Sequence, residues 1–69
     1  MDEQDKTALE MLMDKYSLKT VLEAISEICH EKAEHVQSAW QDDKLSAAWA
    51  AAGQFMDVAA NRRAVERVS

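Results

Sequence analysis

Apolar side chains recur along this chain at the three- and four-residue spacing of amphipathic helices, in three successive segments. The spacing predicts helices over residues 3–15, 19–40 and 44–66. In the second segment the apolar positions follow a period close to 11 residues, which indicates a nearly straight helix. In the third, the alanine-rich stretch around Gly53 has little side-chain bulk, so we expect close helix packing and a packing reason for the glycine.

Residues with helix-capping side chains stand at both predicted junctions. Ser17 is a favourable N-cap residue and predicts a short corner between the first two helices. From Trp40 the next apolar anchor is Leu45, five residues on, so the apolar stripe changes phase. Asp42 and Asp43 are both strong N-cap residues at that point, which predicts a turn without a glycine.

The second and third helices have similar lengths and a short connection, which is typical of an antiparallel helical hairpin. One hairpin leaves much of its apolar stripe exposed, whereas two hairpins complete a four-helix bundle. We therefore predict an all-α homodimer resembling a four-helix bundle, in which the short first helix caps one end or swaps onto the neighbouring subunit. The residues expected in the core or at the dimer interface are Leu22, Ile25, Cys29, Val36, Trp40, Leu45, Trp49, Ala52, Phe55 and Met56.

Composition narrows the class of protein further. The chain has 69 residues, no proline, one glycine and one cysteine, so it is a single helical domain without a disulfide framework. Chains this small commonly gain stability by oligomerisation. A net charge of −5 argues against non-specific binding to nucleic acid or to anionic membranes. No apolar run has membrane-spanning length and no signal peptide opens the chain, so a cytoplasmic location is expected.

Candidate chemistry is sparse. Glu27 and His30 have the Glu-x-x-His spacing of di-iron bundle sites, but only Asp57 is an acid at the matching level of the facing helix. Cys29 lies on the apolar stripe without an acid–base partner, which is typical of a buried, inert thiol. We predict no catalytic, metal-binding or cofactor-binding residue, and hence no enzyme.

Two resemblances bear on the biological context. The segment from Tyr16 to Trp49 resembles a family of small, functionally uncharacterised proteins of bacteria and their mobile elements, which tends to have glycine where this chain has Ser17. The resemblance is carried by Tyr16-Ser17-Leu18, Val21-Leu22-Glu23-Ala24-Ile25, Glu27-Ile28-Cys29, Glu31-Lys32-Ala33, His35-Val36, Trp40-Gln41-Asp42, Leu45 and Trp49. It implies a phage or mobile-element setting. Separately, residues 4–9 (Gln-Asp-Lys-Thr-Ala-Leu) resemble the start of the Rop family of plasmid copy-number regulators, helical-hairpin dimers that bind paired RNA loops.

These features favour a small interaction module that binds a larger host protein stoichiometrically as a regulator or inhibitor. The alternatives are a nucleic-acid-related regulator, either a Rop-like RNA binder or an acidic DNA mimic, and a protein that sequesters a small ligand at the dimer interface. The mimic would use the acidic line on the second helix, which consists of Glu23, Glu27, Glu31 and Glu34. For the protein partner, the favoured surface combines Tyr16 with Arg62, Arg63 and Arg67, and the next candidates are Glu27 and Glu31.

Overall fold

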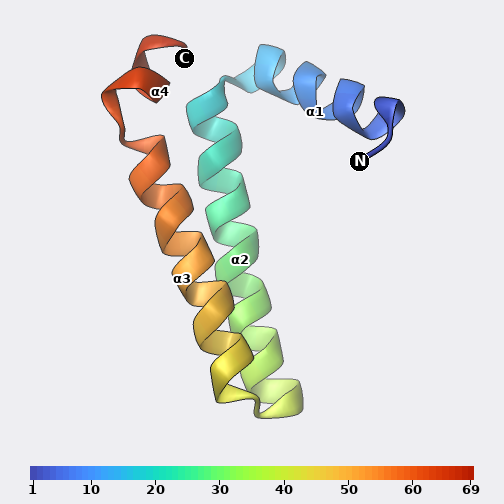
Figure 1. Cartoon of the computed structure of the whole chain (residues 1–69), viewed down its shortest axis with the longest axis vertical. Helices are drawn as coiled ribbons and strands as arrows, with labels where there is room; N and C mark the ends of the chain where they lie inside the picture. Colours follow the sequence, from blue (N-terminus) through green and yellow to red (C-terminus); the bar gives the residue numbers. More distant parts are fainter.

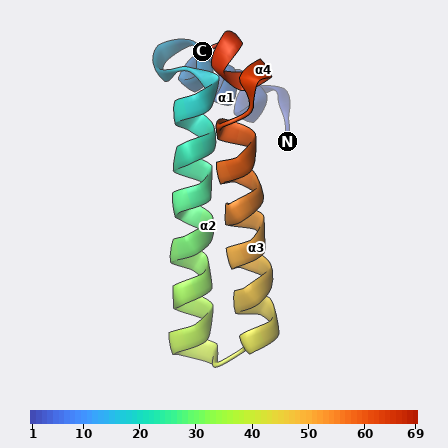
Figure 2. The ribbon, with the colours of Figure 1, turned by 90° about the vertical axis from the view of Figure 1, so that its left-hand side faces the viewer.

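The computed structural model describes all 69 residues and shows an all-α protein, as predicted (Figure 1). Its helices are α1 (Glu3–Tyr16), α2 (Leu18–Trp40), α3 (Asp43–Ala60) and α4 (Arg63–Arg67). The two longest, α2 and α3, lie side by side as the predicted antiparallel hairpin, while α1 points away from the hairpin axis (Figures 1 and 2). None of the helices combines the length and the apolar character needed to cross a bilayer.

Local capping explains where the helices begin. The Asp5 amide donates to Asp2 Oδ1 at 2.8 Å, the Thr20 amide to Ser17 Oγ at 3.3 Å, and the Leu45 amide to Asp42 Oδ1 at 2.9 Å. Each bond satisfies an amide that has no partner within the first helical turn. The predicted caps Ser17 and Asp42 are therefore confirmed.

The hairpin turn forms without glycine because Gln41 takes the left-handed conformation there. Its φ of 53° and ψ of 35° are those that a glycine usually adopts after a helix. Asp42 then begins the next helix, which explains the change of phase between Trp40 and Leu45. The predicted turn is confirmed.

The prediction of one continuous third helix over residues 44–66 is wrong. The helix ends at Ala60, and a separate short helix follows from Arg63. At the helix end the Asn61 side-chain amide and its backbone amide both donate to the carbonyl oxygen of Asp57, at 2.8 and 3.2 Å, and the Arg62 amide donates to Ala59 instead of continuing the helical pattern. Arg62 is extended, with a φ of −75° and a ψ of 144°, which redirects the chain.

Small side chains form the seam between α2 and α3. The buried residues of the chain are Ser26, Cys29, Ala33, Val36, Gly53 and Ala60. The Ser46 hydroxyl donates across the seam to the carbonyl oxygen of Ala33 at 2.9 Å. A Cβ atom added to Gly53 would lie 2.9 Å from His30 Nε2 and 3.2 Å from Cys29 Cβ. Gly53 therefore allows the close approach that the sequence led us to expect.

Because the seam is so close, some of the residues predicted in the core are exposed instead. Cys29 and Val36 are buried as expected, but Trp40 is 72% exposed and Phe55 is 70% exposed, and Leu45 is exposed as well. Helices in contact through small residues have no room between them for bulky side chains. The remaining predicted core residues are partly buried and border the seam: Leu22, Ile25, Trp49, Ala52 and Met56.

Gly53→Val should destabilise the hairpin by about 1–3 kcal/mol, because the added carbons must separate two packed helices. Urea unfolding followed by far-UV circular dichroism measures the change. Gln54→Val is the matched control, since Gln54 is exposed on the same turn and its replacement should cost less than about 0.7 kcal/mol through helix propensity alone. Equal effects of the two substitutions would contradict the close seam.

Candidate functional site

The hairpin has two sides of different chemistry. Ile25, Ile28 and Lys32 share one stripe of α2 because they are separated by three, four and seven residues. Lys32 Nζ lies 5.5 Å from the centre of the Trp49 ring on α3. This contact places the apolar stripe of α2 beside Trp49 and Met56, which are two turns apart on α3.

The opposite side of the hairpin carries ionisable side chains together with the exposed Val58 of α3. His30 lies two residues beyond Ile28, about 200° round the helix, and faces away from the apolar stripe. Its Nε2 atom is 3.8 Å from Asp57 Oδ2 across the seam. Glu27 and Glu31, candidates for partner binding, are exposed on α2 between this side and the apolar stripe.

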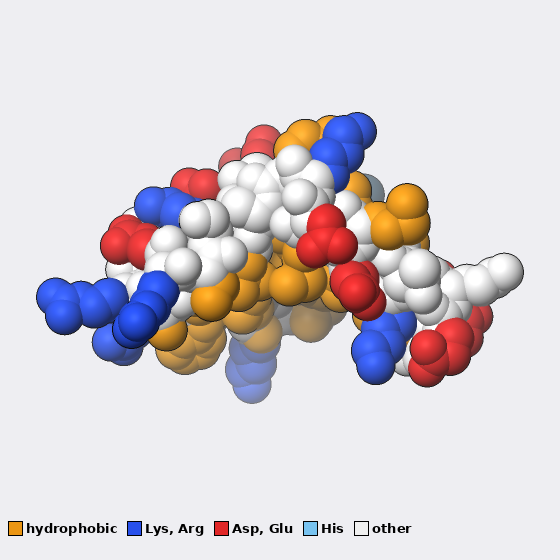
Figure 3. Space-filling model, turned by 90° about the horizontal axis from the view of Figure 1, so that it is seen from above, with side chains coloured by type: hydrophobic (Ala, Val, Ile, Leu, Met, Phe, Trp, Pro, Cys, Tyr) orange, Lys and Arg blue, Asp and Glu red, His pale blue; other side chains and the backbone are white.

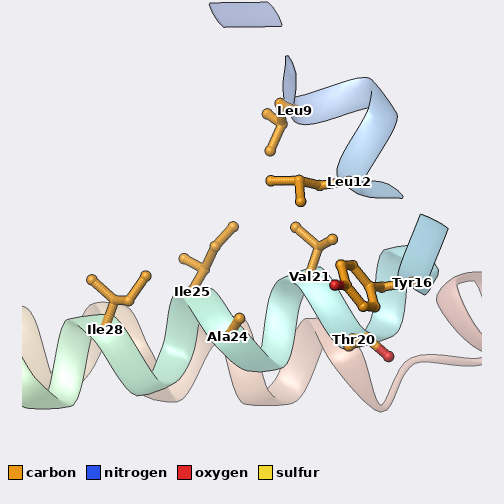
Figure 4. Close-up of a pocket in the computed structure, with 8 residues that line it drawn as sticks. All are labelled: Leu9, Leu12, Tyr16, Thr20, Val21, Ala24, Ile25 and Ile28. Atoms are coloured by element: carbon orange, nitrogen blue, oxygen red, sulfur yellow. The ribbon is translucent and has the colours of Figure 1, made fainter. Parts of the chain in front are cut away.

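The first helix extends the apolar side into a groove. Side chains of α1 point toward those of α2 across a space of about 470 Å³ (Figure 4). The groove is lined by Leu9, Leu12, Tyr16, Thr20, Val21, Ala24, Ile25 and Ile28. The hydroxyls of Tyr16 and Thr20 are the polar side-chain groups in this set, so the groove offers apolar contact area rather than acid–base or nucleophilic chemistry.

Together these side chains form one surface, which we call the concave face. It consists of Leu9 and Leu12 of α1, Val21, Ile25 and Ile28 of α2, and Trp49 and Met56 of α3. Seen along the hairpin, apolar side chains line its hollow and one basic side chain projects from it (Figure 3). Lys and Arg side chains are most numerous at the α4 edge, whereas Asp and Glu side chains lie on both sides. Much of this surface is accessible; Ile28, for example, is 50% exposed.

A strained junction sets the direction of α1. Ser17 has a φ of 107° and a ψ of 155°, a region that is essentially restricted to glycine. Its amide donates to the carbonyl oxygen of Met13 at 2.9 Å, while its hydroxyl oxygen caps α2. Ser17 thus ends one helix and begins the next within a single residue, and the change of direction opens the groove.

The structure separates the residues proposed for partner binding. Tyr16 is 53% exposed at the rim of the groove, and Lys15 Nζ lies 5.1 Å from the centre of its ring. Arg62, Arg63 and Arg67 are exposed around α4 and form no ion pair within the chain.

The α4 segment is attached to the start of α2. Lys19 Nζ lies 3.6 Å from Glu66 Oε1, and the Lys19 amide donates to Ser69 Oγ at 3.0 Å. The arginine end therefore lies beside the beginning of α2, as the hairpin predicted, although no contact joins Tyr16 to an arginine.

The Glu-x-x-His spacing does not become a metal cluster. His30 meets Asp57, as their levels on the two helices predicted, but Glu27 does not join them. No group of three or more His, Cys, Asp or Glu side chains has the proximity to hold a metal ion. Cys29 is a buried free thiol.

The sequence analysis did not identify the residues of the groove as one surface. Leu9, Leu12 and Ile28 all carried an apolar signal. The sequence did not show the direction of α1, which decides whether these apolar side chains are buried in a core or exposed on a surface.

Comparisons with protein-family models, curated proteins and solved structures gave no match for this chain. The resemblances of residues 16–49 and 4–9 therefore remain predictions.

Ser17→Gly should stabilise the protein by about 1 kcal/mol. Glycine relieves about 1–3 kcal/mol of backbone strain. Loss of the cap and the greater flexibility of the unfolded chain together lower the free energy of unfolding by about 1 kcal/mol. Ser17→Ala should destabilise it by about 1 kcal/mol, because the strain stays and the cap is lost. Thermal unfolding of the three proteins at one concentration gives the order, and a glycine variant less stable than the wild type would contradict the assigned strain.

Proposed function

We propose that this protein is a non-enzymatic interaction module that forms a homodimer and binds a larger protein stoichiometrically. The observation that carries the proposal is the concave face, where apolar side chains from three helices stay accessible on one side of a small chain. Exposed apolar surfaces bordered by charged residues are typical of protein–protein contact sites. The resemblance to small proteins of mobile elements supports a role in which the bound protein belongs to the host and is regulated or inhibited.

The chemistry of the groove supports binding rather than catalysis. An active site brings together an acid, a base or a nucleophile in a pocket with defined geometry. The groove between α1 and α2 is lined almost entirely by hydrocarbon side chains. The one contact between ionisable side chains across the seam, His30 with Asp57, lies on the opposite, exposed side of the hairpin.

For the larger partner we favour the end of the molecule that carries Tyr16 and the arginines. Tyrosine and arginine are enriched among the residues that contribute most to binding free energy, whereas charges at an interface rim mainly affect association rates. Arg62 and Arg63 have no acidic partner within the chain and can pair with an acidic side chain of another chain, either the larger protein or a second copy.

A second candidate function rests on the acidic line. Glu23, Glu27, Glu31 and Glu34 are exposed on α2, and none of them forms an ion pair. Adjacent members are about one helical turn apart, close to the spacing of phosphates along a nucleic acid strand. This pattern favours a mimic of nucleic acid over a Rop-like RNA binder, because a row of carboxylates repels RNA.

Affinity capture from host lysate, with protein and nucleic acid both analysed, tests the proposal. We expect recovery of one larger protein in stoichiometric amount. The double variant Arg62→Ala/Arg63→Ala should weaken its binding at least tenfold, which is about 1.4 kcal/mol.

Two further variants locate the binding surface. Glu27→Ala/Glu31→Ala tests the acidic line, and Trp40→Ala tests the exposed tryptophan at the turn. Each variant is compared after circular dichroism and sedimentation show an unchanged helix content and mass. Loss of binding in the glutamate variant alone supports mimicry, loss in Trp40→Ala alone moves the site to the turn, and recovery of RNA instead of protein overturns the proposed function.

A further inference from the structure

The concave face is too apolar, and the chain's own core too small, for the fold to be complete in one copy. Six of 69 residues are buried, and no large side chain is fully buried. Helix α1 has 14 residues and none of them is buried. A helix of that length is marginal in water unless one of its faces packs against something. Small domains without disulfides or structural metals commonly obtain the missing burial from a second copy.

We infer that the concave face is covered by the same face of a second copy, related by a two-fold axis that runs parallel to the α2–α3 hairpin. This inference rests on the homodimer of the proposed function and adds which face and which orientation form it. A two-fold interface uses one patch twice, so that patch must be complementary to itself. The apolar side chains of the concave face meet this condition in any two-fold arrangement, and Lys32, which shares their stripe on α2, adds one cation per copy beside Trp49.

The charges at the two edges of the face select the orientation. Residues 1–16 carry five acids and two lysines, a net charge of −3. Residues 61–69 carry three arginines and one glutamate, a net charge of +2. The two segments lie at opposite edges of the face, at the same end of the hairpin (Figures 1 and 3). Neither the acids of α1 nor the three arginines form an ion pair within the chain.

A two-fold axis parallel to the hairpin exchanges the two edges while it keeps the ends together. Helix α1 of each copy then meets the arginine segment of the other, and opposite charges face each other twice. An axis perpendicular to the hairpin would instead bring α1 to the turn of the second copy. The turn carries Asp42 and Asp43 against Lys44, so like charges would meet there. Charge complementarity of this kind determines the register and orientation of an interface.

A pair of matched variants tests the face. Ile28 is 50% exposed within the concave face, and Val58 is 49% exposed on α3. Val58 lies two residues beyond Met56 and therefore about 200° round the helix, away from the face. Ile28→Glu should raise the dissociation constant of the dimer at least tenfold in sedimentation equilibrium, while Val58→Glu should change it less than about threefold.

The possible results distinguish an error in the assigned face from an error in the homodimer itself. Wild-type protein that is monomeric at micromolar concentration overturns the homodimer and with it the inference. A wild-type dimer that Ile28→Glu and Val58→Glu weaken equally, or that Ile28→Glu leaves intact, overturns the face alone.

A spin-label distance tests the orientation in the full chain, without a substitution in the face. Gln41→Cys in a Cys29→Ala background places one label at the turn of each copy. With the axis parallel to the hairpin both turns lie at one end, and the labels should be less than about 25 Å apart, since packed helices are about 8–10 Å apart. With the perpendicular axis, the 23 residues of α2 separate them by about 34 Å or more. The longer distance would overturn the inferred orientation.

Discussion

The close approach of α2 and α3 along small side chains governs the rest of this molecule. Gly53 lies against Cys29 and His30, and Ser46 donates a hydrogen bond to the backbone of α2. Two helices this close bury little apolar area from large residues. The bulky side chains of both stripes are therefore displaced to the sides of the seam, and most of them to the same side. The exposed apolar surface is a consequence of how the hairpin closes.

The junction at Ser17 turns that surface into a groove. Its backbone conformation is one that glycine adopts without strain, yet its hydroxyl oxygen caps α2, which glycine cannot do. A straight continuation would have merged α1 with α2 into one long helix. The bend instead places the apolar side chains of α1 opposite those of α2, so one strained residue creates the groove between the two helices.

Charge is distributed so that it complements this surface. The side of the hairpin opposite the concave face carries the contact between His30 and Asp57, while the edges of the concave face carry opposite net charges. Burial of apolar surface contributes binding free energy but does not determine how two molecules are oriented. Charges at the edges of such a surface determine the orientation.

Local chemistry determined most of the secondary structure. Helix periodicity, the capping residues Ser17 and Asp42, and the absence of proline predicted the helices and the hairpin, because each of these signals acts within a few residues. The break after Ala60 was missed because neither proline nor glycine marks it; the chain changes direction at the extended Arg62. Exposure of Trp40 and Phe55, and the groove itself, were decided by the tertiary structure. Periodicity gives the direction of a side chain relative to its own helix, whereas burial depends on how closely the next helix approaches and where the first one turns.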